Sequence, residues 1–349
     1  MPDLSFVTLD VFTTRRFEGN PLAIVHVPAG ADLAQDTKQK IAREFDFSET
    51  VFLHDQAADD SSSSSSPGEH KIDIFTVDQE LPFAGHPTIG AASHVLGSSA
   101  SCAVPPAALL VKAGRIPIER VGTSDSLAVV RASVPHDVHI HRNCLRTTEG
   151  LDAVRSRAGS ATVIGHGDPA IEAAELDGPV VSIVRGMAFV LVQLDSLEQL
   201  AQLSVARGAG FDFDLLPTLL DAGPWGHGGG GGGHVSRYYY VVTATHDNDG
   251  KPSMDLRTRL IVMREEDPAT GSAACTLASY LALQKCGAAD AATPAAAGQT
   301  LRYNITQGVE MGRRSEILVE VAMGADGRSI DKVFLGGSAV EVTRGTLSV

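Results

Sequence analysis

The stretch "GHPTIGAASHVLG", residues 85–97, has an echo in the second half of the chain. Residues 86–92, "HPTIGAA", align without gaps on residues 267–273, "DPATGSA". Each stretch places a proline where a helix begins and follows it with apolar residues on one stripe, so we predict helices over 87–97 and 268–287. Both predicted helices are rich in small residues, which suits a helix that is enclosed by strands.

A second, weaker echo precedes the first one in each half. "GNPLAIV", residues 19–25, resembles "GMAFVLV", residues 186–192, and the two pairs occur in the same order. Alternating apolar segments between turn residues indicate that strands dominate the rest of the chain. The order of the echoes therefore predicts a duplicated unit of strands that surround one central helix.

The composition narrows the classes of function. The 349 residues carry a formal charge of −14, which argues against binding to nucleic acid or to an anionic membrane surface. We identify no membrane segment and no secretory leader, and the four cysteines form no paired motif, so we expect a cytoplasmic protein. Two low-complexity runs, 59–68 and 227–234, are expected to be surface loops between strands.

The two helix starts suggest where a substrate binds. Helix N-termini offer unpaired N–H groups and partial positive charge, so two of them that face a common cleft suit a substrate carboxylate. His86 and Asp267 occupy matched positions in the echo, and we expect them to face each other. Asp267 is also a good helix cap, so its position alone favours a structural role, whereas His86 gains little as a cap.

Glu49 and a group of histidines are the other candidates. Glu49 lies among apolar side chains in "FDFSETVF", residues 45–52, where burial would raise its pKa; an exposed strand entrance is the alternative. His136, His139, His141 and Cys144 suggest a metal, but only His139 and His141 share a strand face, so we predict no metal site. No Gly-x-Ser-x-Gly motif indicates a serine hydrolase.

Five motifs together resemble the PhzF-like (phenazine biosynthesis-like) family, which is part of the diaminopimelate-epimerase-like superfamily. They span nearly the whole chain and read "DVFTTRRFEGNPLAIV" (10–25), "FSETVF" (47–52), "IFTVDQELPFAGHPTIGAA" (74–92), "EEDPATGSAAC" (265–275) and "QGVEMGRRSEI" (307–317). The resemblance implies an α+β fold of two similar domains, each a curved, mostly antiparallel sheet around a central helix. We assign 1–130 with 337–349 to the first domain and 131–336 to the second.

The resemblance also implies an activity. The family's isomerase moves a proton between carbons of trans-2,3-dihydro-3-hydroxyanthranilate without a cofactor, and its glutamate, histidine and aspartate match Glu49, His86 and Asp267. Related epimerases use two cysteines at the helix starts, and this chain has none there. We therefore expect a cofactor-independent isomerase of a small carboxylate, and a homodimer by analogy; a non-catalytic carboxylate-binding or regulatory protein is the alternative. The residues expected to bind the substrate are Asn20, Ser48, Gly85, Gly271 and Ser272.

Overall fold

The structure is a computed structural model, and contacts divide it into two compact units. The first unit comprises Met1–Val134, Arg313–Ile317 and Phe334–Val349, and the second comprises Pro135–Gly312 and Leu318–Val333. Both low-complexity runs lie outside the described residues, apart from Gly68 and His234 at their ends. The residues that the structure describes are 3–55, 68–98, 107–121, 129–152, 164–204, 216–226, 234–248, 251–262, 265–287 and 298–349.

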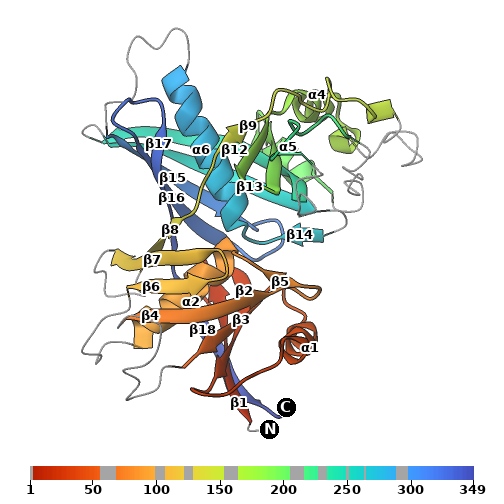
Figure 1. Ribbon diagram of the computed structural model, residues 1–349. Coiled ribbons are helices and arrows are strands. Elements are labelled where there is room, and N and C mark those ends of the chain that lie inside the picture. Colours follow the sequence, from red (N-terminus) through yellow and green to blue (C-terminus); the bar gives the residue numbers. More distant parts are fainter. Residues whose placement is uncertain are drawn as a thin grey trace. The chain divides into compact units, whose positions relative to one another are not determined.

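The first unit surrounds helix α2 (Gly85–Ser98) with strands, as Figure 1 shows. The helix packs against strands β1, β2, β3, β7, β8 and β18. Small side chains let it approach them closely, since Ala91 and Ala92 are fully buried. The strands of this unit are β1 (Leu4–Val11), β2 (Asn20–Val27), β3 (Thr50–His54), β4 (Glu69–Phe75), β5 (Glu80–Leu81), β6 (Ala108–Val111), β7 (Gly114–Val121), β8 (Val129–Val134) and β18 (Ala339–Leu347).

Helix α1 (Gln35–Phe45) is fastened to this sheet by a buried charge cluster. Its apolar stripe buries Ile41 and Ala42. Lys38 of α1 places Nζ 2.5 Å from Asp73 Oδ2 of β4, and His54 Nε2 of β3 lies 2.8 Å from the same oxygen. These two partners lower the pKa of Asp73 to about 2, although burial alone would raise it.

The second unit is built around helix α6 (Gly271–Gly287), which packs against β10, β11 and β15. Two smaller helices, α4 (Pro169–Asp177) and α5 (Leu197–Gln202), and the short helix η1 (Gly165–Gly167) complete it. None of the described helices is long and apolar enough to cross a membrane. Its strands are β9 (His139–Ile140), β10 (Val180–Val184), β11 (Met187–Gln193), β12 (His234–Asn248), β13 (Lys251–Val262), β14 (Glu265–Asp267) and β15 (Thr300–Gln307); β16 (Ser315–Met323) and β17 (Ile330–Gly337) have residues in both units.

The strand pairings confirm the predicted duplication. In the first unit β1–β2 is antiparallel, β2–β3 parallel, β3–β4 and β4–β5 antiparallel, and β4–β6 parallel after the helix. The second unit repeats this order as β10–β11, β11–β12, β12–β13, β13–β14 and β13–β15. Gly19 and Gly186, which begin the weaker echo, both have positive φ. Each lies directly before one of the equivalent strands β2 and β11. The fold is therefore α+β, with two similar units.

The register of the helix echo is different from the one that the gapless alignment predicts. Helix α2 begins at Gly85 soon after β5, and α6 begins at Gly271 soon after β14. Counted from these strands, His86 corresponds to Ser272, so the predicted match of His86 with Asp267 is wrong. Asp267 also does not cap α6, because the carbonyl of Thr270 accepts the first helical hydrogen bond, from Ala274, at 3.0 Å.

Candidate active site

Glu49 and His86 form a direct pair in the first unit. Glu49 directly precedes β3, after a turn in which Asp46 takes a left-handed conformation and ends α1. His86 lies in the first turn of α2 and is 4% exposed, against 19% for the side chain of Glu49. The His86 Nδ1 and Glu49 Oε2 atoms are 2.9 Å apart. A carboxylate at a helix N-terminus also benefits from the partial positive charge there.

The second ring nitrogen of His86 determines how many protons the pair holds. His86 Nε2 lies 3.2 Å from the backbone carbonyl of Pro21 in β2. A carbonyl oxygen only accepts hydrogen bonds, so Nε2 carries a proton, and Nδ1 carries another when it donates to an ionised Glu49. In these hydrogen bonds the pair consists of a carboxylate and an imidazolium, and one proton lies between His86 Nδ1 and Glu49 Oε2.

The pKa of Glu49 is lowered, which corrects the prediction that burial raises it. Burial does oppose the charged form and is the largest single effect. The charge of His86, the hydrogen bond from His86 and a hydrogen bond from the Ser48 hydroxyl act in the opposite direction and together outweigh burial. Glu49 is therefore a carboxylate at neutral pH, which is the state of a general base.

Asp267 lies at the end of β14 in the second unit. Its Oδ2 accepts a hydrogen bond from the Thr270 hydroxyl at 2.5 Å, and its Oδ1 accepts one from the Ala269 N–H at 3.4 Å. These bonds hold residues 268–270, which separate β14 from α6, against the Asp267 carboxylate. The charged group is thus held as an acceptor beside the start of α6.

The remaining predicted residues divide between the two units. Asn20 is buried at the start of β2, Ser48 is exposed beside Glu49, and Gly85 is the buried first residue of α2. Gly271 is the buried first residue of α6, and Ser272 beside it is half-buried. The structure thus brings Ser48, Glu49 and His86 together. The sequence did not indicate the contact with the Pro21 carbonyl. The "GNP" motif at residues 19–21, where β2 begins, is the signal that could have pointed to it.

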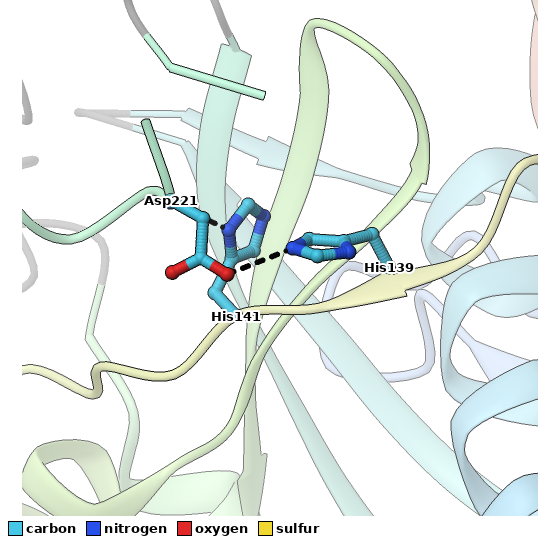
Figure 2. A group of neighbouring side chains, drawn as sticks. All are labelled: His139, His141 and Asp221. Atoms are coloured by element: carbon cyan, nitrogen blue, oxygen red, sulfur yellow. Dashed lines mark hydrogen bonds and ion pairs between the residues drawn. The ribbon is translucent and has the colours of Figure 1, made fainter. Parts of the chain in front are cut away.

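The histidine group gains a member that the sequence did not indicate. Figure 2 shows His139, His141 and Asp221, whose candidate ligand atoms lie within 4.8 Å of one another. His139 Nε2 donates to Asp221 Oδ2 at 2.9 Å, and His141 Nδ1 accepts the Asp221 backbone N–H at 2.9 Å. His136 and Cys144, the other two residues of the metal-like pattern in the sequence, are not in this group.

The hydrogen bonds of His141 favour a structural role for this group. Its Nε2 donates to Ser182 Oγ at 2.9 Å, so both ring nitrogens are occupied by protein partners. Burial and the neighbouring His139 lower the pKa of His141 to about 4, so the ring is neutral and has only the one lone pair that Asp221 N–H uses. Trp225 stacks on His139 at 4.5 Å between ring centroids. The group fastens residues 216–226 to β9.

The described thiols do not provide an alternative base. Cys275 lies in the second turn of α6, is fully buried, and has its pKa raised by burial, so it is not a thiolate. Cys144 is also a free thiol, and it is remote in sequence from both helix starts. The residues at those starts are Gly85, His86, Gly271 and Ser272.

Comparison with known proteins identifies the relatives of this chain. An uncharacterized isomerase of Mesorhizobium japonicum is 29% identical over the full length of both proteins. The trans-2,3-dihydro-3-hydroxyanthranilate isomerase of Pseudomonas aeruginosa is 37% identical over 87 residues, which are 25% of this chain and 28% of that protein.

Solved structures share the fold at lower identity. A PhzF-family protein of Bacillus anthracis superposes with a TM-score of 0.67 at 17% identity, and the match covers all of both chains. A probable proline racemase of Agrobacterium radiobacter superposes with a TM-score of 0.56 at 14% identity, over 99% of this chain and 93% of that one. The family model described as phenazine biosynthesis-like protein matches residues 9–209 and 236–345. The chain, whose two sequence relatives described above are named isomerases, belongs to the phenazine biosynthesis-like family.

Proposed function

We propose that this protein is a cofactor-independent isomerase that moves a proton between two carbons of a small substrate bearing a carboxylate. The contact of 2.9 Å between Glu49 and His86 carries the proposal, because it provides an ionised base with a proton-bearing partner. The trans-2,3-dihydro-3-hydroxyanthranilate isomerases among the relatives support the reaction type. The absence of cysteine at both described helix starts favours a carboxylate over a two-thiol mechanism.

In the proposed reaction Glu49 carries the proton. A carbon–hydrogen bond of the substrate breaks, its electron pair moves into the adjoining unsaturated system, and an oxygen–hydrogen bond forms on Glu49. That bond then breaks as the proton passes to a second carbon, so substrate and product differ only in the position of hydrogen. His86, which donates to Glu49 Oε2, leaves Oε1 to meet the substrate and stabilises the carboxylate before and after each transfer.

The other predicted residues bind the substrate in this proposal. Asp267 accepts a hydrogen bond from a donor group of the substrate, in line with the aspartate of the family. Gly85, Gly271 and Ser272 supply N–H and hydroxyl groups at two helix starts, where a carboxylate is favoured. Asn20 and Ser48 contribute polar contacts beside His86 and Glu49. The homodimer and the cytoplasmic location remain parts of the proposal that rest on analogy and on composition.

The test is solvent deuterium incorporation into trans-2,3-dihydro-3-hydroxyanthranilate and related cyclic carboxylates in D₂O. The wild-type protein is expected to introduce deuterium at carbon, and Glu49→Gln is expected to lose at least about 100-fold of that rate, because general acid–base groups contribute about that much. Glu44→Gln makes the same chemical change on the exposed face of α1 and should have no effect. Undiminished incorporation by Glu49→Gln would remove the proton-carrying role. Binding of these carboxylates without any incorporation by the wild-type protein would favour the binding-protein alternative.

A further inference from the structure

A fully buried side-chain amide lies under the segment that carries Asp267. Gln307 ends β15, and its side chain has no exposed surface. Its Nε2 donates to the backbone carbonyl of Asp267 at 2.8 Å and to Thr270 Oγ1 at 3.1 Å. Its Oε1 accepts from the Thr270 N–H at 3.4 Å and from the Tyr238 hydroxyl at 3.0 Å. One amide thus contacts both ends of the segment between β14 and α6.

The directions of these hydrogen bonds are fixed by chemistry. The Asp267 carbonyl only accepts, so the nitrogen of the Gln307 amide must face it, and the oxygen must face Tyr238. Burial raises the pKa of Tyr238, so its phenol keeps its single proton, which lies within reach of Gln307 Oε1 and of Thr258 Oγ1. Thr258, also buried, lies 2.9 Å from the Tyr238 hydroxyl and holds it in place. The amide therefore has a single satisfied orientation.

Thr270 transmits this orientation to the Asp267 carboxylate. Its hydroxyl oxygen receives a proton from Gln307, so its own proton is left to point at Asp267 Oδ2, 2.5 Å away. If the Gln307 amide were absent, the Thr270 hydroxyl would be able to rotate, and the Asp267 carbonyl would lose this partner. The Thr270 hydroxyl thereby holds Asp267 Oδ2, while the Ala269 N–H at 3.4 Å contacts Oδ1.

We propose that Gln307 is a positioning residue, which acts through Thr270 to hold the Asp267 carboxylate in the orientation and charge state that the reaction uses. This rests on the proposed function in one respect only, namely that Asp267 meets the substrate. Gln307 itself is buried and does not touch the substrate. The chain of contacts runs from Thr258 and Tyr238 through Gln307 and Thr270 to Asp267, entirely within the second unit.

The experiment compares four single variants of the full chain and the double variant Gln307→Met/Thr270→Val. Gln307→Met removes the amide at similar volume, Thr270→Val removes the hydroxyl, and Thr270→Ser retains it. Gln193→Met is the control, because Gln193 accepts from Tyr240 at 3.1 Å in a second Tyr–Gln pair, which joins β11 to β12. Turnover of trans-2,3-dihydro-3-hydroxyanthranilate gives kcat and KM, and crystal structures of the variants give a readout that does not depend on turnover.

A positioning role predicts a specific pattern. Gln307→Met and Thr270→Val each lower kcat at least about 10-fold, the double variant is no worse than the single ones, and Thr270→Ser and Gln193→Met stay within about threefold of wild type. Losses that multiply in the double variant, or a fall in thermal stability without a change in kcat, would overturn the proposal. If the wild-type protein turns over no probe, the proposed function fails instead. The Gln307→Met crystal structure still decides the positioning role, because an unchanged Thr270–Asp267 contact would refute it.

Discussion

The pair of Glu49 and His86 sets two opposing effects against each other on one carboxyl group. Burial favours the neutral acid, and a cation at 2.9 Å favours the carboxylate. The charge of His86 and the hydrogen bonds from His86 and Ser48 together outweigh burial, so the group is ionised in the resting protein. This differs from a general acid, whose pKa is raised by a hydrophobic pocket, and it fits a residue that must take a proton before it gives one.

The charge of His86 leads to a prediction about pH. Because the pKa of Glu49 is lowered in the folded protein, the carboxylate is present at neutral pH and is lost only as the pH falls below about 4.3, the usual value for glutamate. The acid limb of kcat/KM is therefore expected below that pH. In His86→Gln burial acts without the opposing charge, so the acid limb should move up by about 1 unit or more. Rates measured from pH 3 to 8 would show this shift.

His94→Gln is the control for that shift. His94 lies farther along the same helix, and burial and the neighbouring His26 lower its pKa to about 4, so it is neutral through most of the range. Its replacement should leave the acid limb unchanged. An acid limb that does not move in His86→Gln would mean that another group keeps Glu49 ionised.

For single residues, the sequence identifies candidate site residues, but it does not show whether their interaction raises or lowers the pKa of Glu49. The apolar neighbours of Glu49 in residues 45–52 are visible in the sequence and indicate burial correctly. The opposing charge comes from His86, which is distant in the chain and reaches Glu49 only through the fold. Asp221 was missed for a similar reason, because nothing near it in sequence indicates that β9 brings His139 to its carboxylate.

Helix α2 shows at the scale of elements why small residues recur in the echo. A Cβ atom on Gly90 would lie 2.3 Å from Leu22 Cδ2 and 3.0 Å from Val11 Cγ2, both on fully buried side chains of the surrounding strands. Interiors are packed closely enough that such an atom forces its neighbours to move. The absence of a side chain at Gly90 therefore sets how closely β1 and β2 approach the helix.

Substitution of Gly90 is expected to be destabilising. Gly90→Ala should lower the free energy of unfolding by about 1–3 kcal/mol through overpacking, although alanine is the better helix former. Gly97→Ala in the same helix is the matched control, because a Cβ atom there meets nothing within 4 Å. It should be neutral or stabilising by up to about 1 kcal/mol. Urea unfolding of both variants tests the difference, and equal midpoints would contradict the packing account.

Several elements could have been predicted and were not. Helix α4 has a capping aspartate, Asp168, whose side chain accepts from Ala170 and Ile171, and Pro169 follows it directly. Strand β15 alternates buried and exposed residues. Both signals are local and legible in the sequence. The start of α6 is different, because Pro268 suggests a first helical residue, whereas the helix begins at Gly271, after a segment held by contacts of Asp267, Thr270 and Gln307.

At the scale of the whole molecule, the first unit is assembled from segments that lie far apart in the sequence. Strand β1 lies between β2 and β18 and pairs with β18 along its full length, from Leu4 opposite Leu347 to Val11 opposite Ala339. The first unit thus depends on the last residues of the chain, whereas the second is made of residues 135–312 and 318–333. Neither the first nor the last strand has a complete set of partners without the other.

Removal of residues 338–349 is expected to unfold the first unit. The deletion exposes one edge of β1 and the side of α2 that β18 covers, so the first unit should lose its cooperative transition while the second retains one. Limited proteolysis with mass spectrometry would locate the cleavage within residues 3–134. Protection of that region in the shortened chain would mean that β18 is dispensable. Removal of residues 3–11 should have the same effect from the other end.

The pairing of β1 with β18 also constrains the order in which a newly made chain acquires its structure. Proteins of several domains commonly complete the N-terminal one first during synthesis. Here the ribosome must reach the final strand before the first unit can close, while the second has all its residues once Val333 has emerged. Strand β1 is therefore made long before its partner β18, and its edge stays open to pairing with other chains during that time. A chaperone that binds nascent strands would have its natural target there.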